Sequence, residues 1–302
     1  MSMKQGMQNV MGLDRIKQCI DETGVSIDGL CVDYFMRRPF FKEQDVETRN
    51  IFRRENMTIL SHIAASAGDI GARLMMLPYV DNASMSDDDV DMVVAFMHEL
   101  SDVVARHDVH LTVETDFPPS KFQSFLDEFD DDEVMANYDS GDSAHWGYDH
   151  YEEITGMNRR IANVHIKDRV KGGGTVPLGK GDANFDKIFK GLKDIQYCGN
   201  ITLQVAREAD GQETNTVREQ LEFVKGYVGK HGLKRGKKMK YGIMQGRLTP
   251  SNGRGIQFFP FENWENEFYV ARDIGLDEIE FIFDYPNYTQ NPLWTSTGGG
   301  TY

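Results

Sequence analysis

The sequence predicts a closed (β/α)8 barrel, because short β-rich runs alternate with helical stretches along nearly the whole chain. Strands separated by helices of this length form parallel βαβ units. Eight such units close into a barrel whose usual size is about 250 residues, and a chain of 302 residues accommodates one. A doubly wound open sheet is the alternative, but no GxGxxG sequence follows any of the predicted strands.

The predicted strands are short runs rich in β-branched, aliphatic and aromatic residues. They are 25–35, 72–80, 109–116, 133–139, 161–168, 199–206, 241–246 and 277–284. Helices are expected between them, where apolar residues recur at helical spacing or acidic residues mark a helix start. They are 12–23, 45–67, 85–106, 119–128, 149–158, 184–193, 213–228 and 262–274.

The composition is that of a globular protein without affinity for polyanions. The formal net charge of −15 argues against nucleic-acid binding. No run approaches the roughly 20 apolar residues that span a bilayer, and the N-terminus lacks the apolar core of a signal peptide. Cys19, Cys31 and Cys198 are too widely spaced for a structural zinc site and argue against a disulfide framework. We therefore expect a cytoplasmic protein with no membrane or nucleic-acid partner.

Four polar residues end consecutive predicted strands: Glu114, Asp139, His165 and Gln204. The C-terminal strand ends of such a barrel are where its active sites lie. Oxygen-rich ligands with a single imidazole favour Mn²⁺, Mg²⁺ or Co²⁺, with Zn²⁺ as a further candidate. A bound ion could polarise a sugar carbonyl and its neighbouring hydroxyl while Glu114 moves the proton from the adjacent carbon. The simpler alternative is that each residue caps its strand in a polar barrel mouth.

Several short sequence motifs at these strand ends resemble those of a known family. "LTVETD", "NYDSGDSA", "RIANVHIKDR" and "VPLGKGDANF" resemble the sugar phosphate isomerase/epimerase family, the xylose isomerase-like TIM barrels. "YGIMQGRLTP", "FPFENWENEF" and "DEIEFIFD" resemble the opening of that family: first strand, first helix and second strand. The resemblance covers nearly the whole chain and implies a metal-dependent isomerase or epimerase of a ketose or sugar phosphate, acting through an enediolate.

The same resemblance implies a metal-binding quartet of Glu114, Asp139, His165 and Gln204, in which the first and last residues would be the catalytic pair. In the ketose epimerases the last position is a glutamate. A carboxamide can offer an oxygen to a metal but cannot act as a base. A two-glutamate epimerisation therefore needs another base here, for which Glu280 and Asp168 are candidates.

The remaining candidates lie at or just beyond strand ends and could meet a phosphate or an acidic sugar. These substrate-binding candidates are Lys167, Arg169, Arg207, Gln245, Arg247 and Glu280. His145 and Trp146 are expected in a loop after Asp139, and the glycine-rich stretch 171–185 in a mobile loop. Tyr34 and Phe35 are expected to form an apolar wall of the pocket.

Three alternative functions stay open at this point. One is a sugar-binding barrel that has lost catalysis with the glutamine at position 204. Another is an inosose-type dehydratase, which needs the same enolisation chemistry. An endonuclease IV-like repair enzyme is disfavoured, because it needs a histidine-rich zinc cluster and only His165 of the eight histidines lies clearly at a strand end.

The family's opening words stand near the end of this chain, which suggests a circular permutation. Met239 occupies the place of the family's start methionine, and residues 230–240 read as a basic linker between the old termini. We expect one barrel domain over residues 1–302 that begins with the family's strands three to eight and finishes with strands one and two. Residues 295–302 are expected to be a flexible tail, and a homodimer is possible because barrels of this family often pair.

Overall fold

The computed structural model describes residues 3–233 and 239–294. The predicted tail, 295–302, and the centre of the predicted linker, 234–238, lie outside the described residues.

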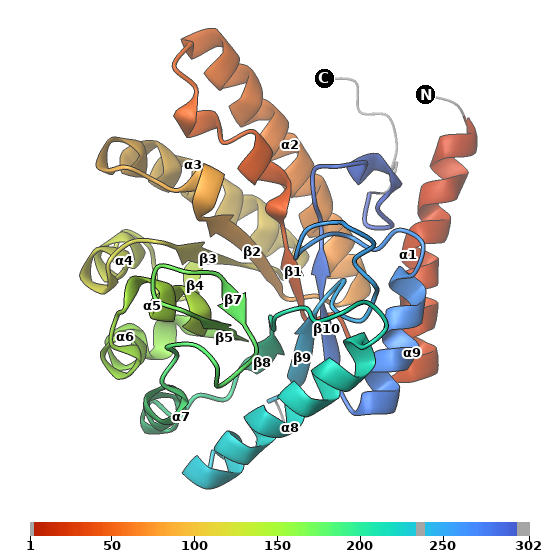
Figure 1. Ribbon diagram of the computed structural model, residues 1–302. Coiled ribbons are helices and arrows are strands. Elements are labelled where there is room, and N and C mark those ends of the chain that lie inside the picture. The colour runs from red at the N-terminus through yellow and green to blue at the C-terminus, as the bar shows by residue number, and fades with distance from the viewer. Residues whose placement is uncertain (1–2, 234–238, 295–302) are drawn as a thin grey trace.

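Parallel strands close into a barrel, as predicted (Figure 1). Around the barrel the order is β1-β10-β9-β8-β5-β4-β3-β2. In chain order the strands are β1 (Gly29–Cys31), β2 (Leu74–Tyr79), β3 (His110–Thr115), β4 (Val134–Asp139), β5 (Ile161–Ile166), β8 (Asn200–Leu203), β9 (Tyr241–Met244) and β10 (Glu278–Ile282). Each falls inside a predicted run, so the barrel prediction is confirmed strand by strand.

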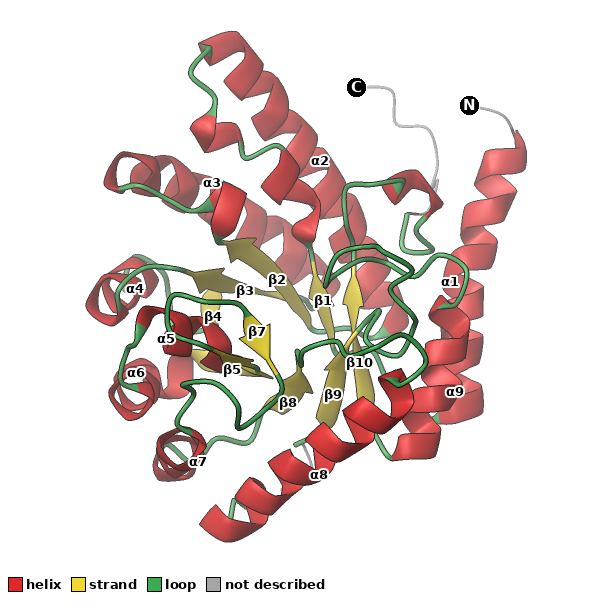
Figure 2. Cartoon of the chain, in the orientation of Figure 1, coloured by secondary structure: helices red, strands yellow, loops and turns green. Residues whose placement is uncertain are grey.

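The helices surround the strands on the outside (Figure 2). They are α1 (Met3–Thr23), α2 (Val46–Ile70), α3 (Val90–Val104), α4 (Pro119–Leu126), α5 (Ser140–Trp146), α6 (His150–Met157), α7 (Phe185–Asp194), α8 (Glu213–His231) and α9 (Trp264–Ile274). None of these described helices combines the length and the apolar character needed to cross a bilayer. Their apolar faces pack on the buried strands, which therefore read as continuous apolar runs.

Helix α5 is the main departure from the predicted elements, because its residues were expected in a loop. Its first residues are Ser-Gly-Asp, which have weak helix propensity. The side chain of Asp139 supplies the missing start, since its Oδ1 accepts hydrogen bonds from the N–H groups of Gly141 (2.7 Å) and Asp142 (3.0 Å). Gly147, at φ 75°, ends the helix.

The glycine-rich stretch after β5 is also more ordered than predicted. It forms a small antiparallel hairpin of β6 (Asp168–Arg169) and β7 (Thr175–Val176). The buried carboxylate of Asp168 accepts three backbone hydrogen bonds, from the N–H groups of Gly179, Gly181 and Ala183, at 2.8–3.0 Å. Asp168 therefore anchors this stretch, and its carboxylate is occupied rather than free to serve as a base.

Strand β1 ends earlier than predicted. Tyr34 and Phe35 lie in the 3-10 helix η1 (Asp33–Arg37), where both are buried. The ring of Tyr34 contacts Phe283, and the ring of Phe35 contacts Tyr79. Both residues belong to the hydrophobic core. The prediction that they form an apolar wall of the pocket is wrong, because neither lines the cavity described below.

The segment after β10 packs against α1 at the side of the barrel. Strand β9 pairs with β8 on one side and with β10 on the other, and β10 pairs with β1. Gly12 of α1 packs against Pro292, so closely that a Cβ at position 12 would lie 2.7 Å from the Pro292 carbonyl oxygen. The segment that follows β10 therefore lies beside the helix with which the chain begins.

Candidate metal centre and cavity

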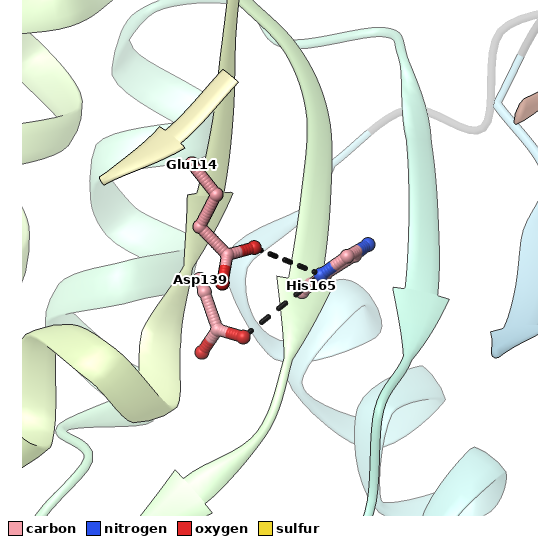
Figure 3. Close-up of side chains that lie close together, drawn as sticks. All are labelled: Glu114, Asp139 and His165. Atoms are coloured by element: carbon pink, nitrogen blue, oxygen red, sulfur yellow. Dashed lines mark ion pairs between the residues drawn. The ribbon is translucent and has the colours of Figure 1, made fainter. Parts of the chain in front are cut away.

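Three predicted ligands converge at the C-terminal ends of neighbouring strands (Figure 3). Glu114 comes from β3, Asp139 from β4 and His165 from β5, and each offers a ligand atom within 4.8 Å of the others. The Nδ1 atom of His165 lies 3.4 Å from Glu114 Oε2 and 3.9 Å from Asp139 Oδ2. All three side chains are buried. Two carboxylates and one imidazole around one point form a donor set that fits a divalent cation.

The orientation of His165 is fixed from behind. Its Nε2 lies 2.8 Å from Oε2 of Glu280, which also accepts from Asn163 Nδ2 at 3.0 Å. With Nε2–H donated to that carboxylate, Nδ1 is left to face Glu114 and Asp139, as in the carboxylate–histidine pairs behind metal ligands. Asn137, whose Nδ2 donates to Glu114 Oε2 at 2.7 Å, holds the second ligand in the same way.

Burial and neighbouring charges shift the pKa of every residue in this cluster. Burial, and then the nearby Asp139, raise the pKa of Glu114 to about 7. Burial also raises the pKa of Asp139, against the opposing charge of Lys167. Burial lowers the pKa of His165, but Glu280 and Glu114 outweigh it and leave that pKa well above its usual value. A divalent ion would supply the positive charge that these protons supply in its place.

A cavity of about 350 Å³ is lined by Glu114 of the cluster, whereas Asp139 and His165 are not among its lining residues. Its size suits a small ligand such as a monosaccharide. Of the predicted residues it brings together Glu114, Lys167, Arg169, Gln204 and Arg247. Trp146, about half exposed at the end of α5, also lines it.

Lys167 and Arg169 share a carboxylate partner, Asp142, that the sequence analysis missed. Asp142 Oδ1 lies 3.3 Å from Lys167 Nζ and 2.9 Å from Arg169 Nη1. Lys167 Nζ also lies 3.4 Å from Asp139 Oδ2. The two cations therefore brace the carboxylates of the site.

Three predicted substrate-binding residues do not line the cavity. Arg207 donates to the backbone carbonyls of Gly246, Thr249 and Ile256, and so holds the loop after β9. Gln245 Oε1 accepts from the N–H of Ile282 at 2.9 Å. Glu280 lies inside the barrel behind His165. The structure gives these three side chains partners within the protein.

Gln204 has partners that the sequence analysis also missed. Its Nε2 donates to Gln257 Oε1 at 3.1 Å, and Gln257 Nε2 donates to Asp33 Oδ2 at 2.7 Å. Gln257 belongs to the loop between β9 and α9, and Asp33 begins η1. All three side chains line the cavity.

The family model of the xylose isomerase-like TIM barrel matches residues 5–227. The chain belongs to this family. L-ribulose-5-phosphate 3-epimerase UlaE of Salmonella paratyphi A is 25% identical over 222 residues, which cover 71% of this chain and 76% of that protein.

Solved structures of the same fold include that of an L-ribulose 3-epimerase, with a TM-score of 0.58 and 14% identity over 72% of this chain and 80% of the other. Another is that of the IolI protein with a bound zinc atom, with a TM-score of 0.55 and 15% identity over 72% of this chain and 81% of the other. At these identities the likeness shows the fold alone.

The match to the xylose isomerase-like family model stops short of β9 and β10, although both strands are needed to close the barrel. We propose that the chain is a circular permutation in which the family's first two strands follow its last helix. The pairing of β9 between β8 and β10 supports this proposal, as does the packing of Gly12 against Pro292. Ends that lie close together make such a rearrangement tolerable.

We expect a reordered chain that starts at Met239, runs to Tyr302 and continues from Met1 to Lys238 to fold into the same barrel. Its circular dichroism spectrum should match that of the natural order, and its melting temperature should lie within a few degrees. A control chain opened inside β3, between Thr112 and Val113, should fail to fold, because that break interrupts the barrel. A reordered chain that stays unfolded would contradict the permutation.

Proposed function

We propose that this protein is a metal-dependent epimerase or isomerase of a ketose or ketose phosphate. The observation that carries the proposal is the buried cluster of Glu114, Asp139 and His165, of which Glu114 also lines a cavity of monosaccharide size. The UlaE relative, whose name is that of a ketose-phosphate epimerase, supports the choice of substrate class.

The clustered residues and Gln204 would have different roles in an enolisation. Glu114, Asp139 and His165 would hold Mn²⁺, Mg²⁺ or Co²⁺, which when bound stabilises negative charge on the oxygens of an enediolate. Glu114 would take the proton from the carbon next to the carbonyl and could return it to the neighbouring carbon on the same face of the enediolate, which gives an isomerisation. An epimerisation would need a second proton donor on the opposite face. Gln204 would contact the substrate or the ion through its amide, because it cannot exchange a proton.

A screen for product tests this proposal. The protein is incubated with each metal and with a panel of ketoses and ketose phosphates, and the products are followed by NMR. We expect one pair of epimeric or isomeric sugars to interconvert only when a divalent metal is present. Conversion that survives complete metal removal would refute the mechanism.

Gln204 favours one second candidate, a sugar-binding barrel that has lost turnover. Such a protein would bind ketoses in calorimetry with the same metal dependence, yet give no product and no proton exchange. The absence of both reactions with a sugar that demonstrably binds would decide for this candidate.

We also propose that the substrate carries an anionic group, and that Arg247 receives it. Arg247 is 3% exposed and lines the cavity. Its Nε donates to the Val205 carbonyl at 3.0 Å and its Nη1 to the Ile256 carbonyl. Within the part of the chain that the structure describes, no carboxylate lies within 4.0 Å of it, in contrast to Lys167 and Arg169. A buried cation without a counter-ion favours an anionic ligand.

We expect Arg247→Gln to lower kcat/KM for a ketose phosphate by about 10- to 100-fold, the loss of a charge-assisted hydrogen bond. The value for the unphosphorylated ketose should change by less than about threefold. Arg254→Gln is the matched control, because Arg254 belongs to the same loop but does not line the cavity. Equal losses for both sugars would contradict an anion site at Arg247.

A further inference from the structure

A hydrogen-bonded row of three side chains crosses one wall of the cavity. It runs from Asp33, the first residue of η1, through Gln257 in the loop between β9 and α9, to Gln204 directly after β8. Asp33 is held from its other side, because its Oδ1 accepts from the Cys31 thiol at 3.1 Å. The row therefore joins parts of the chain that are far apart in sequence and fixes Gln204 from the side.

The chemistry of the row permits one orientation of its amides. An ionised carboxylate only accepts hydrogen bonds, so Gln257 must turn its NH₂ group toward Asp33. Its carbonyl oxygen then faces Gln204, and that oxygen can only accept. Gln204 must therefore turn its own NH₂ group toward Gln257. This deduction follows from donor and acceptor chemistry and agrees with the distances of 2.7 and 3.1 Å.

The consequence is a carbonyl oxygen with nothing to bind. Gln204 Oε1 is buried and has no hydrogen-bond partner among the described residues. A buried, unsatisfied polar atom costs about 1–3 kcal/mol, and such atoms call for an explanation such as an ion. The Gln204 side chain lines the same cavity as Glu114, one of the three clustered ligands.

We propose that Asp33 and Gln257 are positioning residues for Gln204, the fourth residue of the quartet that the family resemblance implies, and that they leave its Oε1 free to bind the divalent cation. This inference rests on the metal centre of the proposed function. With a neutral ligand at position 204, the charges of Glu114 and Asp139 balance a doubly charged ion, whereas a glutamate would leave an excess negative charge. A fixed orientation compensates for the weaker donor, because a ligand that is already turned toward the ion loses little freedom on binding.

Metal titration calorimetry without any sugar tests the proposal. Asp33→Asn puts an amide at the head of the row, and an amide can donate as well as accept. The side-chain amide of Gln257 can then exchange the positions of its oxygen and NH₂ group, and the amide of Gln204 can follow. We expect this variant to bind Mn²⁺ at least about 10-fold more weakly than the wild type, the usual effect of losing a group that orients a ligand.

A double variant distinguishes orientation from general damage. In Asp33→Asn/Gln257→Glu the amide at position 33 donates to a carboxylate at position 257, and that carboxylate can only accept from Gln204 Nε2. The direction of the row is restored with the same net charge as the wild type, so we expect Mn²⁺ affinity to return to within about threefold of the wild-type value. A merely structural role for Asp33 predicts no such recovery.

The matched control is Asp81→Asn, which removes a carboxylate from the cavity wall without touching the row. Equal weakening by Asp81→Asn and Asp33→Asn would assign the effect to charge and overturn the proposal. Wild-type affinity in Asp33→Asn, or no recovery in a folded double variant, would overturn it as well. A wild type that binds no divalent cation would overturn both this inference and the proposed function, whereas the other outcomes leave the proposed function standing.

Discussion

Glu114→Gln is expected to lower kcat by about 1000-fold or more, because one substitution removes both the proposed base and a negatively charged ligand. General acid–base catalysis alone contributes about 10²- to 10⁴-fold. The amide has the same shape, so the cavity should stay intact. Activity is measured on the sugar pair that the product screen identifies, and metal affinity by calorimetry on the same preparations.

The stability of this variant separates loss of chemistry from loss of fold. Burial raises the pKa of Glu114 in the folded protein. At a pH above the pKa that Glu114 has in the unfolded chain, this shift lowers the free energy of unfolding. The melting temperature of Glu114→Gln at pH 8 should therefore be no lower than that of the wild type.

Asp116→Asn is the control for Glu114→Gln. Asp116 lies just beyond the end of the same strand, binds the Ser84 hydroxyl at 3.0 Å and lines the same cavity, but is not part of the metal cluster. Its replacement should cost much less activity. A kcat for Glu114→Gln within tenfold of the wild type would exclude Glu114 as the base.

Glu267→Ala is expected to cause a large loss of stability, about 3 kcal/mol or more, since each of three buried donors that lose their partner costs about 1–3 kcal/mol. Glu267 lies on α9 and is 1% exposed. Its carboxylate accepts from the N–H groups of Gly246 (2.9 Å) and Leu248 (3.1 Å) and from the Thr249 hydroxyl (2.9 Å). Urea unfolding measures the change in the free energy of unfolding.

The same substitution should also weaken anion binding, because Glu267 holds the loop that carries Arg247. Glu265→Ala is the matched control on the same helix, since Glu265 makes an exposed ion pair with Arg15, and such pairs contribute at most about 1 kcal/mol. A free energy of unfolding for Glu267→Ala equal to that of the Glu265→Ala control would show that other groups support the loop.

The strand pattern and the three clustered ligands could be predicted because both follow simple periodicities. Buried parallel strands read as apolar runs, and their ends converge on one face of the barrel. The same reasoning could have found Asn137, since it stands two residues before Asp139 and alternate residues of a strand share a face. Asn163 stands in the same relation to His165.

The parts that could not be predicted depend on contacts between distant segments. Glu280 looked like a strand-end residue, but only the register of β10 against its neighbours shows that it lies behind His165. Asp33 and Gln257 belong to no motif, and they meet only because β1 and the loop after β9 reach the same wall. Helix α5 depends on a cap from Asp139, a residue whose motif suggested only a ligand.

Solvent deuterium exchange tests the central claim most directly. The protein loaded with Mn²⁺ is mixed with ketoses and ketose phosphates in D₂O, and deuterium at the carbons next to the carbonyl is followed by NMR. We predict incorporation at one such carbon that requires the metal and disappears in Glu114→Gln. A metal-loaded protein that binds a ketose but leaves every one of these protons in place, or that exchanges them equally well without Glu114, would contradict an enolisation centre at the mouth of this barrel.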